Sequence, residues 1–361
     1  MVTMTSVALD VHARSTQATS VDMVTGEVAR ARLSGDTDEL VGFLLGLAQP
    51  VRACYEAGPT GFGLARAARA AGIVLEVIAP SKTPRKRGER IKTDRRDADH
   101  LVRQLIAGAL TPIRIPSADE EAARDVLRDR EQVRGDLLRA RHRLSKFLLR
   151  NGRVWPAEKS AWTQRHRAWL DRQRFSEIDL ELVYTDLVAT VDALCDRRER
   201  LDRALDAVAR RDAYWPTVSR LRAFRGIDTI SALGIHLEVG DWTRFAKAKD
   251  VGAYFGLVPS LDQSGEGSTS GQITKTGSRY ARRLLVEAAW HNAHPPRVGL
   301  TLRRRQDGIP DPVRQISWAC QRRLHHLSRR FDERRVNGNK ANIARARELA
   351  CFLWAAATWE P

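Results

Sequence analysis

The stretch SVALDVHARSTQATSVDMVTGEVARARL, residues 6–33, has the pattern of three short strands separated by turns. Its first two segments, Ser6–His12 and Thr16–Asp22, alternate in character along the chain, as half-buried strands do. The dipeptide Thr25-Gly26 marks a tight turn before the third segment, Glu27–Leu33. The stretch therefore predicts a meander of three strands.

Helix and strand patterns alternate after this meander. The predicted order is a helix over Asp36–Ala48, a strand over Val51–Ala57, a helix over Thr60–Ala71 and a strand over Ile73–Ala79. Ser81–Ile91 has no periodicity and much charge, which indicates a basic loop, and Thr93–Ala109 follows as a helix. A meander followed by helix–strand units is typical of a mixed α/β sheet.

The composition narrows the class of partner and the compartment. The chain has 361 residues, enough for two or three domains, and a formal net charge of +17, which favours a polyanionic partner such as nucleic acid. Its four cysteines are scattered without CxxC spacing, which argues against a disulfide framework or a zinc site and fits a reducing cytoplasm. The N-terminus lacks a signal-peptide pattern, and we expect no membrane partner because no apolar run could span a bilayer.

The middle of the chain carries heptad repeats. From Leu180 to Val208, apolar residues recur at seven-residue spacing, and Arg198 interrupts the intermediate positions. Ala118–Leu149 has the same rhythm, and the Trp-rich, charged segment Asn151–Phe175 is expected to form a tip between them. Sustained heptads predict long coiled-coil helices, paired antiparallel as a stalk or paired with another subunit. Two helices of an ordinary bundle are the plainer alternative.

The C-terminal part is helical and rich in turns. FRGIDTISALGIHLEVG, residues 224–240, places Gly226 and Gly234 around a short helix and resembles a helix–hairpin–helix. In that motif backbone N–H groups contact phosphates, although a glycine turn between helices more often serves packing alone. We expect a long Gly/Ser loop to follow from residue 257, closed by a helix with Arg279, Arg282 and Arg283 near its start.

Two acidic residues lie at strand positions that are unusual for carboxylates. Asp10 lies inside an apolar strand, where burying a carboxylate is costly unless it is paired or bound to metal. Glu56 ends the strand VRACYEA just before a Gly-Pro turn, and ligands bind at such strand ends in α/β sheets. Pairing of Asp10 with a buried arginine and capping of the turn by Glu56 are the plainer explanations.

Further acids lie at the head of the helix in KTDRRDADHLVRQL, residues 92–105. Asp94 and Asp97 begin a stripe that runs through Leu101 to Leu105, because residues three and four apart share a helix face. Asp99 is expected on the opposite side, facing water. Asp94 could instead be an N-cap with Asp97 at the third helical position, which needs no metal.

Together Asp10, Glu56, Asp94 and Asp97 have the composition of a two-metal phosphodiester site. Carboxylate oxygens suit Mg²⁺ or Mn²⁺. Two such ions roughly 3.5–4 Å apart stabilise both the attacking and the leaving oxygen. The joint pattern favours this interpretation over the separate explanation of each acid.

Five stretches of the chain resemble one family, in the same order. They are ALDVHARSTQATSVD, CYEAGPTGFGLAR, KTDRRDADHLVRQL, GLVPSLDQSGEG and ITKTGSRYARRLLVEAAW. This ordered set, which covers nearly the whole chain, resembles the DEDD insertion-sequence transposases of the IS-one-ten type. The resemblance implies a DNA transposase or recombinase of a bacterial insertion sequence, which would act in the cytoplasm at the nucleoid.

The resemblance implies a fold, a metal site and a set of partners. It implies a RuvC/RNase H-like domain over residues 1–115, a coiled-coil insertion over 116–215 and a helical C-terminal transposase domain over 216–361. It places Asp10, Glu56, Asp94 and Asp97 at the tetrad positions that bind Mg²⁺ or Mn²⁺. The implied partners are donor and target DNA, a noncoding guide RNA that pairs with both, and a homo-oligomer, dimer or tetramer, formed through the coiled coil.

The resemblance also implies a nucleophile, Ser264, in the Gly-flanked sequence DQSGEG. The family's serine attacks DNA phosphodiesters, and a small neighbouring side chain allows a phosphate to approach closely. A plain flexible loop is the alternative, and Ser268, Ser270 and Ser278 are neighbouring candidates. Because neither a G-x-S-x-G elbow nor a Walker A motif occurs, we expect neither a Ser–His–Asp hydrolase nor a need for ATP.

Two sets of basic residues are predicted to bind nucleic acid. The first lies beside the proposed metal site and would follow phosphates, unless it is only a solvated loop; it comprises Lys82, Arg85, Lys86, Arg87, Arg90 and Lys92. The second surrounds the helix after the serine and comprises Lys275, Arg279, Arg282 and Arg283.

Two other functions remain open at this point. A metal-dependent Holliday-junction-type endonuclease of the RNase H fold would need the acidic tetrad but not Ser264. A catalytically silent nucleic-acid-binding protein would need neither, and its acids would be structural. The full tetrad argues against the silent protein, and the serine sequence argues against the simple nuclease.

Overall fold

The computed structural model describes residues 4–80, 83, 94–156, 159–264 and 267–360, with the main chain only for residues 94–96, 261–264 and 267–270. The chain divides into two compact units, Met1–Ala118 and Asp119–Pro361. Each unit has its own hydrophobic core. The expected domain limits at residues 115 and 215 stay predictions, since the second unit holds both the long helices and the C-terminal helices.

The first unit is built on a mixed five-stranded sheet with the strand order β3-β2-β1-β4-β5. Its strands are β1 (Thr5–Val11), β2 (Ser15–Asp22), β3 (Val28–Ser34), β4 (Val51–Glu56) and β5 (Val74–Ile78). β1, β2 and β3 pair antiparallel, whereas β1, β4 and β5 run parallel to their neighbours in that order. The predicted meander and helix–strand units are confirmed, and the sheet is compatible with an RNase H-like fold.

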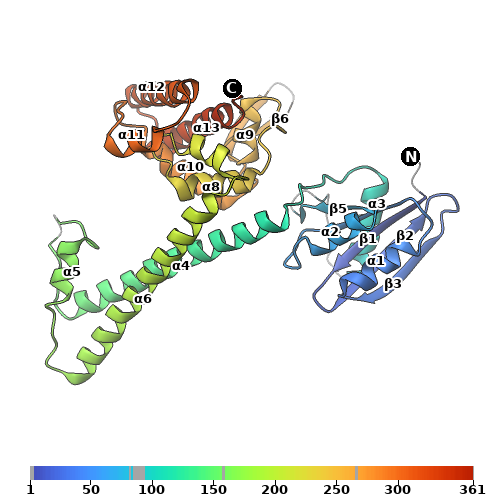
Figure 1. Cartoon of the computed structure of the whole chain (residues 1–361), viewed down its shortest axis with the longest axis horizontal. Helices are drawn as coiled ribbons and strands as arrows, with labels where there is room; N and C mark the ends of the chain where they lie inside the picture. Colours follow the sequence, from blue (N-terminus) through green and yellow to red (C-terminus); the bar gives the residue numbers. More distant parts are fainter. Residues whose placement is uncertain (1–3, 81–82, 84–93, 157–158, 265–266, 361) are drawn as a thin grey trace. The chain divides into compact units, whose positions relative to one another are not determined.

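Helices cover both faces of this sheet (Figure 1). α1 (Thr37–Leu45) and α2 (Gly63–Ala70) pack on one face, and α3 (Asp94–Ile106) packs on the other. Since side chains alternate along a strand, Val7 and Leu9 join the core under α1 and α2, while Ala8 joins the core under α3. All three side chains are fully buried, so β1 is the central strand in packing as well as in order.

The second unit begins with two long helices, α4 (Ala118–Arg150) and α6 (Ile178–Ala209), which lie side by side (Figure 1). Arg130 pairs with Asp202 at 2.8 Å, and Arg141 lies 3.8 Å from the sulfur of Cys195. As the residue number rises on α4 it falls on α6, so the helices are antiparallel. The predicted helix pair is therefore present, whereas the coiled-coil interlocking of its side chains stays a prediction.

A short helix, α5 (Gln164–Leu170), lies in the segment that joins α4 to α6. The sequence indicated a tip here but not a helix. Its aromatic and aliphatic side chains share a core with the ends of the long helices, which includes Leu144, Leu170 and Tyr184. Burial against α4 and α6, rather than local propensity, gives this short segment its regular structure.

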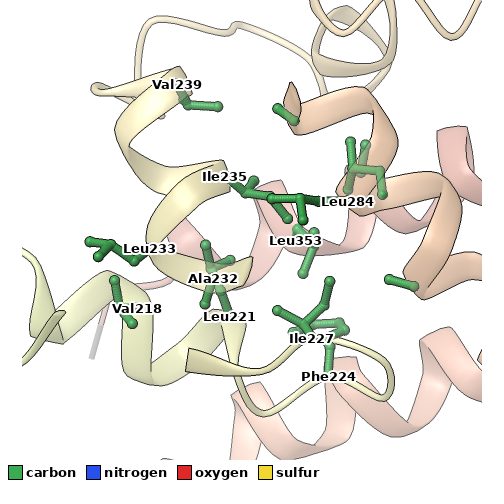
Figure 2. Packing of buried hydrophobic residues seen from close by; sticks show 14 of the residues in the cluster. Val218, Leu221, Phe224, Ile227, Ala232, Leu233, Ile235, Val239, Leu284 and Leu353 are labelled. Atoms are coloured by element: carbon green, nitrogen blue, oxygen red, sulfur yellow. The ribbon is translucent and has the colours of Figure 1, made fainter. Parts of the chain in front are cut away.

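The remaining helices form one packed domain around α13. They are α7 (Trp215–Leu221), α8 (Thr229–Val239), α9 (Ala248–Tyr254), α10 (Arg279–His291), α11 (Leu300–Gln306), α12 (Asp311–Glu333) and α13 (Gly338–Ala357). α13 packs against α7, α9, α10 and α12. Figure 2 shows Ile235 of α8, Leu284 of α10 and Leu353 of α13 in the same core. None of the helices in the described ranges has an apolar stretch long enough to cross a bilayer.

The predicted helix–hairpin–helix corresponds to α7, a turn and α8. Gly226 in the turn has a φ of 84°, and a Cβ added there would lie 2.7 Å from the carbonyl oxygen of Ala288. The first amides of α8 are capped by Asp228, whose carboxylate accepts a hydrogen bond from the amide of Ser231. The glycine therefore has a packing role, as in the plainer alternative, and an acidic cap occupies the place of a phosphate.

The expectation of a long Gly/Ser loop from residue 257 was wrong. Pro259–Ser264 and Gly267–Ile273 pair antiparallel as strands β6 and β7, and Ser264 is paired with Gly267. Only Gly265 and Glu266 separate these two residues, and a two-residue connection with glycine first is a hairpin signal. The many small residues concealed this signal.

Candidate metal centre and serine hairpin

Two of the four predicted acids lie side by side at the ends of parallel strands. Leu9 pairs with Tyr55 in the β1–β4 ladder, so the next residues, Asp10 and Glu56, are neighbours across the two strands. Neighbouring strands are about 4.8 Å apart. Both residues belong to the same alternating set as Ala8 and Cys54, which pack under α3, and so lie on the face that α3 covers.

Both carboxylates have polar neighbours and remain partly open to solvent. Asp10 Oδ2 lies 3.2 Å from Nε2 of His12, and the Asp10 side chain is 25% exposed. Glu56 Oε1 accepts a hydrogen bond of 2.8 Å from the hydroxyl of Thr83. Asp10 is therefore less buried than the apolar sequence of its strand suggested. The bond that Glu56 accepts comes from Thr83 and not from the turn that follows β4.

The helix that carries the other two acids packs as predicted. Asp94 is the first residue of α3 and Asp97 lies in its first turn. Leu101 and Leu105, on the stripe that begins at Asp97, are 4% and 0% exposed. α3 packs against β1 and β2, so Asp97 lies on the helix that covers the face bearing Asp10 and Glu56. The convergence of all four carboxylates stays a prediction.

The prediction that Asp99 faces water was wrong. Its carboxylate accepts a hydrogen bond of 2.9 Å from Thr19 and two bonds, of 2.9 and 3.1 Å, from the guanidinium of Arg30. Burial raises the pKa of Asp99, but the hydrogen bonds from Arg30 and Thr19 outweigh it and hold the pKa below its ordinary value. The helical pattern alone did not show that α3 lies close enough to β2 and β3 for these bonds.

The carboxylates in the first unit are of the type that binds a hard divalent cation, but the described side chains do not form a full set of metal ligands. Asp10 and Glu56 offer adjacent carboxylate oxygens, the ligands that Mg²⁺ and Mn²⁺ prefer. Among the residues that the structure describes, no three His, Cys, Asp or Glu side chains are arranged to hold a metal ion. The Asp94 side chain lies outside the described residues.

Sequence reasoning missed two neighbours of these acids, His12 and Thr83. His12 follows Asp10 by two residues, just beyond the end of β1, and the period of the predicted strand Ser6–His12 places both on one side. That spacing was visible in the sequence. The contact between Thr83 and Glu56 joins residues 27 positions apart and has no local signal.

Ser264 is the last residue of strand β6 and is paired with Gly267 of β7. The base of the hairpin is fixed to the helical domain by Arg282, which donates hydrogen bonds of 2.9 and 2.7 Å to the carbonyl oxygens of Phe255 and Thr276. The backbone amide of Thr274 adds a bond to the carbonyl oxygen of Val258. The hairpin is therefore held at its base, with Ser264 at the other end.

The predicted basic residues have different surroundings. Lys82, Arg85, Lys86, Arg87, Arg90 and Lys92 lie outside the described residues. Arg283 pairs with Glu131 of α4 and Glu287 of α10, and Arg282 holds the hairpin base. Lys275 and Arg279 are exposed, with no ion pair in the described part of the chain. Nucleic-acid binding stays a prediction for all ten residues.

Comparisons with known proteins match both units. Residues 7–151 match a DEDD transposase domain of the IS110 type, and residues 218–300 match the domain described as Transposase IS116/IS110/IS902 family. The putative transposase y4qE of Sinorhizobium fredii is 39% identical over 307 residues, which span 84% of this chain and 74% of that protein. The chain belongs to the IS110-type transposase family.

Other transposases are similar over most of the chain. The transposase for insertion sequence element IS1533 of Leptospira borgpetersenii is 31% identical over 79% of this chain and 83% of that protein. A probable family 20 transposase of Pseudomonas aeruginosa is 28% identical over 66% of this chain and 70% of that protein. The DEDD match contains Asp10, Glu56, Asp94 and Asp97, and membership implies a general dependence on divalent metal. The second match contains Ser264.

Proposed function

We propose that this transposase cleaves and rejoins DNA strands at a composite site made of the tetrad Asp10, Glu56, Asp94 and Asp97 and the nucleophile Ser264. The observation that carries the proposal is the register of β1 and β4, which makes Asp10 and Glu56 neighbours at the ends of parallel strands. Two adjacent carboxylates repel each other unless a cation lies between or beside them. Their position on the face covered by α3 is where Asp97 can complete the set.

The tetrad would hold Mg²⁺ or Mn²⁺ through carboxylate oxygens. A divalent ion bound there would stabilise negative charge on the phosphate oxygens and favour ionisation of an attacking hydroxyl. His12, 3.2 Å from Asp10, orients that carboxylate from one side, and Thr83 does the same for Glu56 through its hydroxyl. These two neighbours fix the directions of the ligand oxygens.

Ser264 would carry the strand exchange as a covalent intermediate. Its hydroxyl oxygen forms a bond to the DNA phosphorus, the bond from phosphorus to one sugar oxygen breaks, and that oxygen leaves as a hydroxyl with the serine's proton. A sugar hydroxyl of the other DNA then reverses the step and releases the serine. One ester bond replaces another at each stage, so no ATP is required.

The proposed partners are donor DNA, target DNA and a noncoding guide RNA that pairs with both. The formal net charge of +17 supports binding of several polyanionic strands at once. Sequence choice would come from base pairing with the RNA, while the protein holds the strands through phosphate contacts.

The proposed assembly is a homo-oligomer formed through α4 and α6. A pair of helices buries only one side of each, and α6 exposes Ile178 and Leu182 by 84% and 69%. α4 exposes Leu138 by 48%. Exposed apolar side chains on both long helices favour a second copy of the same helix pair, and this arrangement could supply Ser264 from one subunit to the acids of another.

The test is a strand-exchange assay with the co-purified RNA, using Asp10→Asn and Glu56→Gln. Both changes keep the size of the side chain and remove the charge that holds a metal, so cleavage should fall at least about 100-fold. Glu76→Gln is the matched control, since Glu76 lies on β5 and pairs with Arg52. Full cleavage by Asp10→Asn would refute the metal site. Unaltered nucleic-acid binding together with no cleavage by the wild-type chain would favour the silent protein.

A further inference from the structure

The segment between α4 and α6 contains a cluster of aromatic rings around one buried histidine. The rings of Trp155, Trp162 and Trp169 have their centroids 5.1, 4.9 and 5.5 Å from that of His166. His166 is only 4% exposed. Neither the acidic tetrad nor the serine hairpin uses these residues.

Trp162 has an unfavourable backbone conformation within this cluster. Its φ is 64°, in the left-handed region that bulky side chains avoid. Such a conformation is costly and persists where the surrounding structure demands it. It places the indole under the guanidinium of Arg141, whose central carbon lies 4.8 Å from the ring centroid.

A cavity of about 180 Å³ opens beside these two side chains. We call it the tip pocket; it is lined by Arg141, Trp162, His166, Leu170, Val191 and Asp192, among others. A cavity of about 150 Å³ accommodates benzene, so the tip pocket has room for one planar ring. Its walls combine aromatic and aliphatic side chains with the guanidinium of Arg141 and the carboxylate of Asp192, which pairs with Arg167.

Two polar groups at the tip pocket lack partners. The Nδ1 atom of His166 and the Nε atom of Arg141 are buried and accept or donate no hydrogen bond in the described part of the chain. Arg141 has no carboxylate partner there either, whereas Arg167 pairs with Asp171 and Asp192. Burial and the nearby Arg141 charge lower the pKa of His166, so its ring is neutral at pH 7. A neutral ring and a guanidinium without a carboxylate partner in the described residues suit a planar ligand with an attached phosphate.

We propose that the tip pocket binds one unpaired nucleobase of a nucleic-acid strand, with the base stacked on Trp162 and its phosphate beside Arg141. A core that served only to close the tip would need no cavity, no strained tryptophan and no unpartnered ring nitrogen. All three occur here at one place. Aromatic stacking recognises the face of any base, and the neutral Nδ1 of His166 can accept a hydrogen bond from its edge.

The proposal rests on the chain's place among transposases and not on the chemistry proposed for the tetrad and Ser264. Its test measures binding and not cleavage, so a negative result would not affect the chemistry proposed for the tetrad and Ser264, and a failure of that chemistry would not affect base binding. An extruded base held at the tip would fix the position of a strand along α4 and α6. That interaction would add to phosphate binding, which does not distinguish one position on a strand from the next.

The test uses single strands of about 12 nucleotides, one of RNA and one of DNA, each carrying one 5-iodouracil. Binding to the full chain is measured in about 0.5 M salt, where phosphate contacts are weak and stacking persists. Irradiation should then link the base to the peptide that holds Trp162 and His166. Trp162→Asn, in which asparagine accepts the left-handed backbone, should raise the Kd about 5- to 150-fold, the loss expected for one stacked base.

The matched control is Trp155→Ala, which removes an indole of the same size from the cluster but not from the pocket wall. It should change the Kd by less than about threefold, and Arg141→Gln should weaken binding while keeping the tip folded. Cross-linking of RNA, of DNA or of both supports the proposal and names the strand. An equal loss with Trp155→Ala, no cross-link at the tip, or unchanged binding by both pocket variants would overturn it.

Discussion

Asp99 shows how one side chain can hold α3 to the sheet. Its carboxylate joins the helix to β2 through Thr19 and to β3 through Arg30. The two predicted metal ligands of α3 precede it by two and five residues on the same helix. The hydrogen bonds that Asp99 accepts therefore contribute to placing the first turn of α3 over the face that carries Asp10.

Replacement of Asp99 should lower stability in a pH-dependent way. Because the folded pKa lies below its ordinary value, the carboxylate stabilises the fold above about pH 4 and ceases to do so as the pH falls through the lowered pKa. Asp99→Asn should therefore melt about 2–4 °C lower at pH 7, the shift for one partly exposed charged pair. Thermal melts across pH would contradict this if the difference did not shrink in acid.

At the residue scale, the alternation of strands was enough to predict the positions of two of the four proposed metal ligands, Asp10 and Glu56. Asp10 and Glu56 lie at the ends of strands whose pattern was visible in the sequence, and parallel pairing of these strands makes the two residues neighbours. The environment of Asp99 was not predictable, because its partners on β2 and β3 are 80 and 69 residues away. A helical wheel shows which residues share a face but not which strands that face meets.

At the scale of elements, the position of the hairpin β6–β7 depends on single residues at its base, Gly277 and Arg282. Gly277 has a φ of 68°, and an added Cβ would run into the carbonyl oxygen of Tyr254. The same region is tied by Arg282 to the carbonyl of Thr276. The hairpin base thus depends on close contact between two backbone segments.

Gly277→Ala should loosen the hairpin base. The positive φ alone disfavours alanine by about 1–3 kcal/mol, and the clash with Tyr254 adds to that cost. Hydrogen exchange should speed up at Thr274 and Lys275 while α13 stays protected. Gly299→Ala is the control, since open space surrounds that glycine. Equal exchange in both variants would show that Gly277 does not hold the hairpin.

Helices were predicted correctly where apolar residues recurred regularly along one face of a long segment. The predicted helix Asp36–Ala48 is observed as α1, which begins after the Asp36 cap, and the heptads predicted α4 and α6. The hairpin was missed because its serines and glycines resemble a loop, and α5 was missed because it depends on packing against α4 and α6. Tertiary contacts decide such short elements.

At the scale of the whole molecule, the proposed chemistry requires acids from the first unit and a serine from the second. No sequence pattern predicts how two units meet around a third molecule. DNA is the natural bridge, because both units would have to bind the phosphate that is attacked. A long helix pair that also binds a second copy would allow the serine and the acids to come from different subunits.

The salt dependence of nucleic-acid binding tests whether the basic residues between Lys82 and Lys92 contact phosphates. Neutralising Arg85, Lys86 and Arg87 should reduce the slope of log K against log salt by about 0.7–0.9 for each phosphate that the protein no longer neutralises. Neutralising Arg128, Arg139 and Arg314, each in a local ion pair, is the control and should change the slope less. Equal slopes for wild type and the first variant would favour a solvated loop.

The most direct test of the composite site is the covalent link between protein and DNA. Strand exchange with labelled DNA and the co-purified RNA is stopped by denaturation, and the label that stays on the protein is measured and mapped. The wild-type chain should retain DNA on Ser264, whereas Ser264→Ala and Asp10→Asn should retain none. Undiminished adduct in Ser264→Ala, or cleavage without any adduct, would contradict a serine nucleophile served by the acids of β1 and β4.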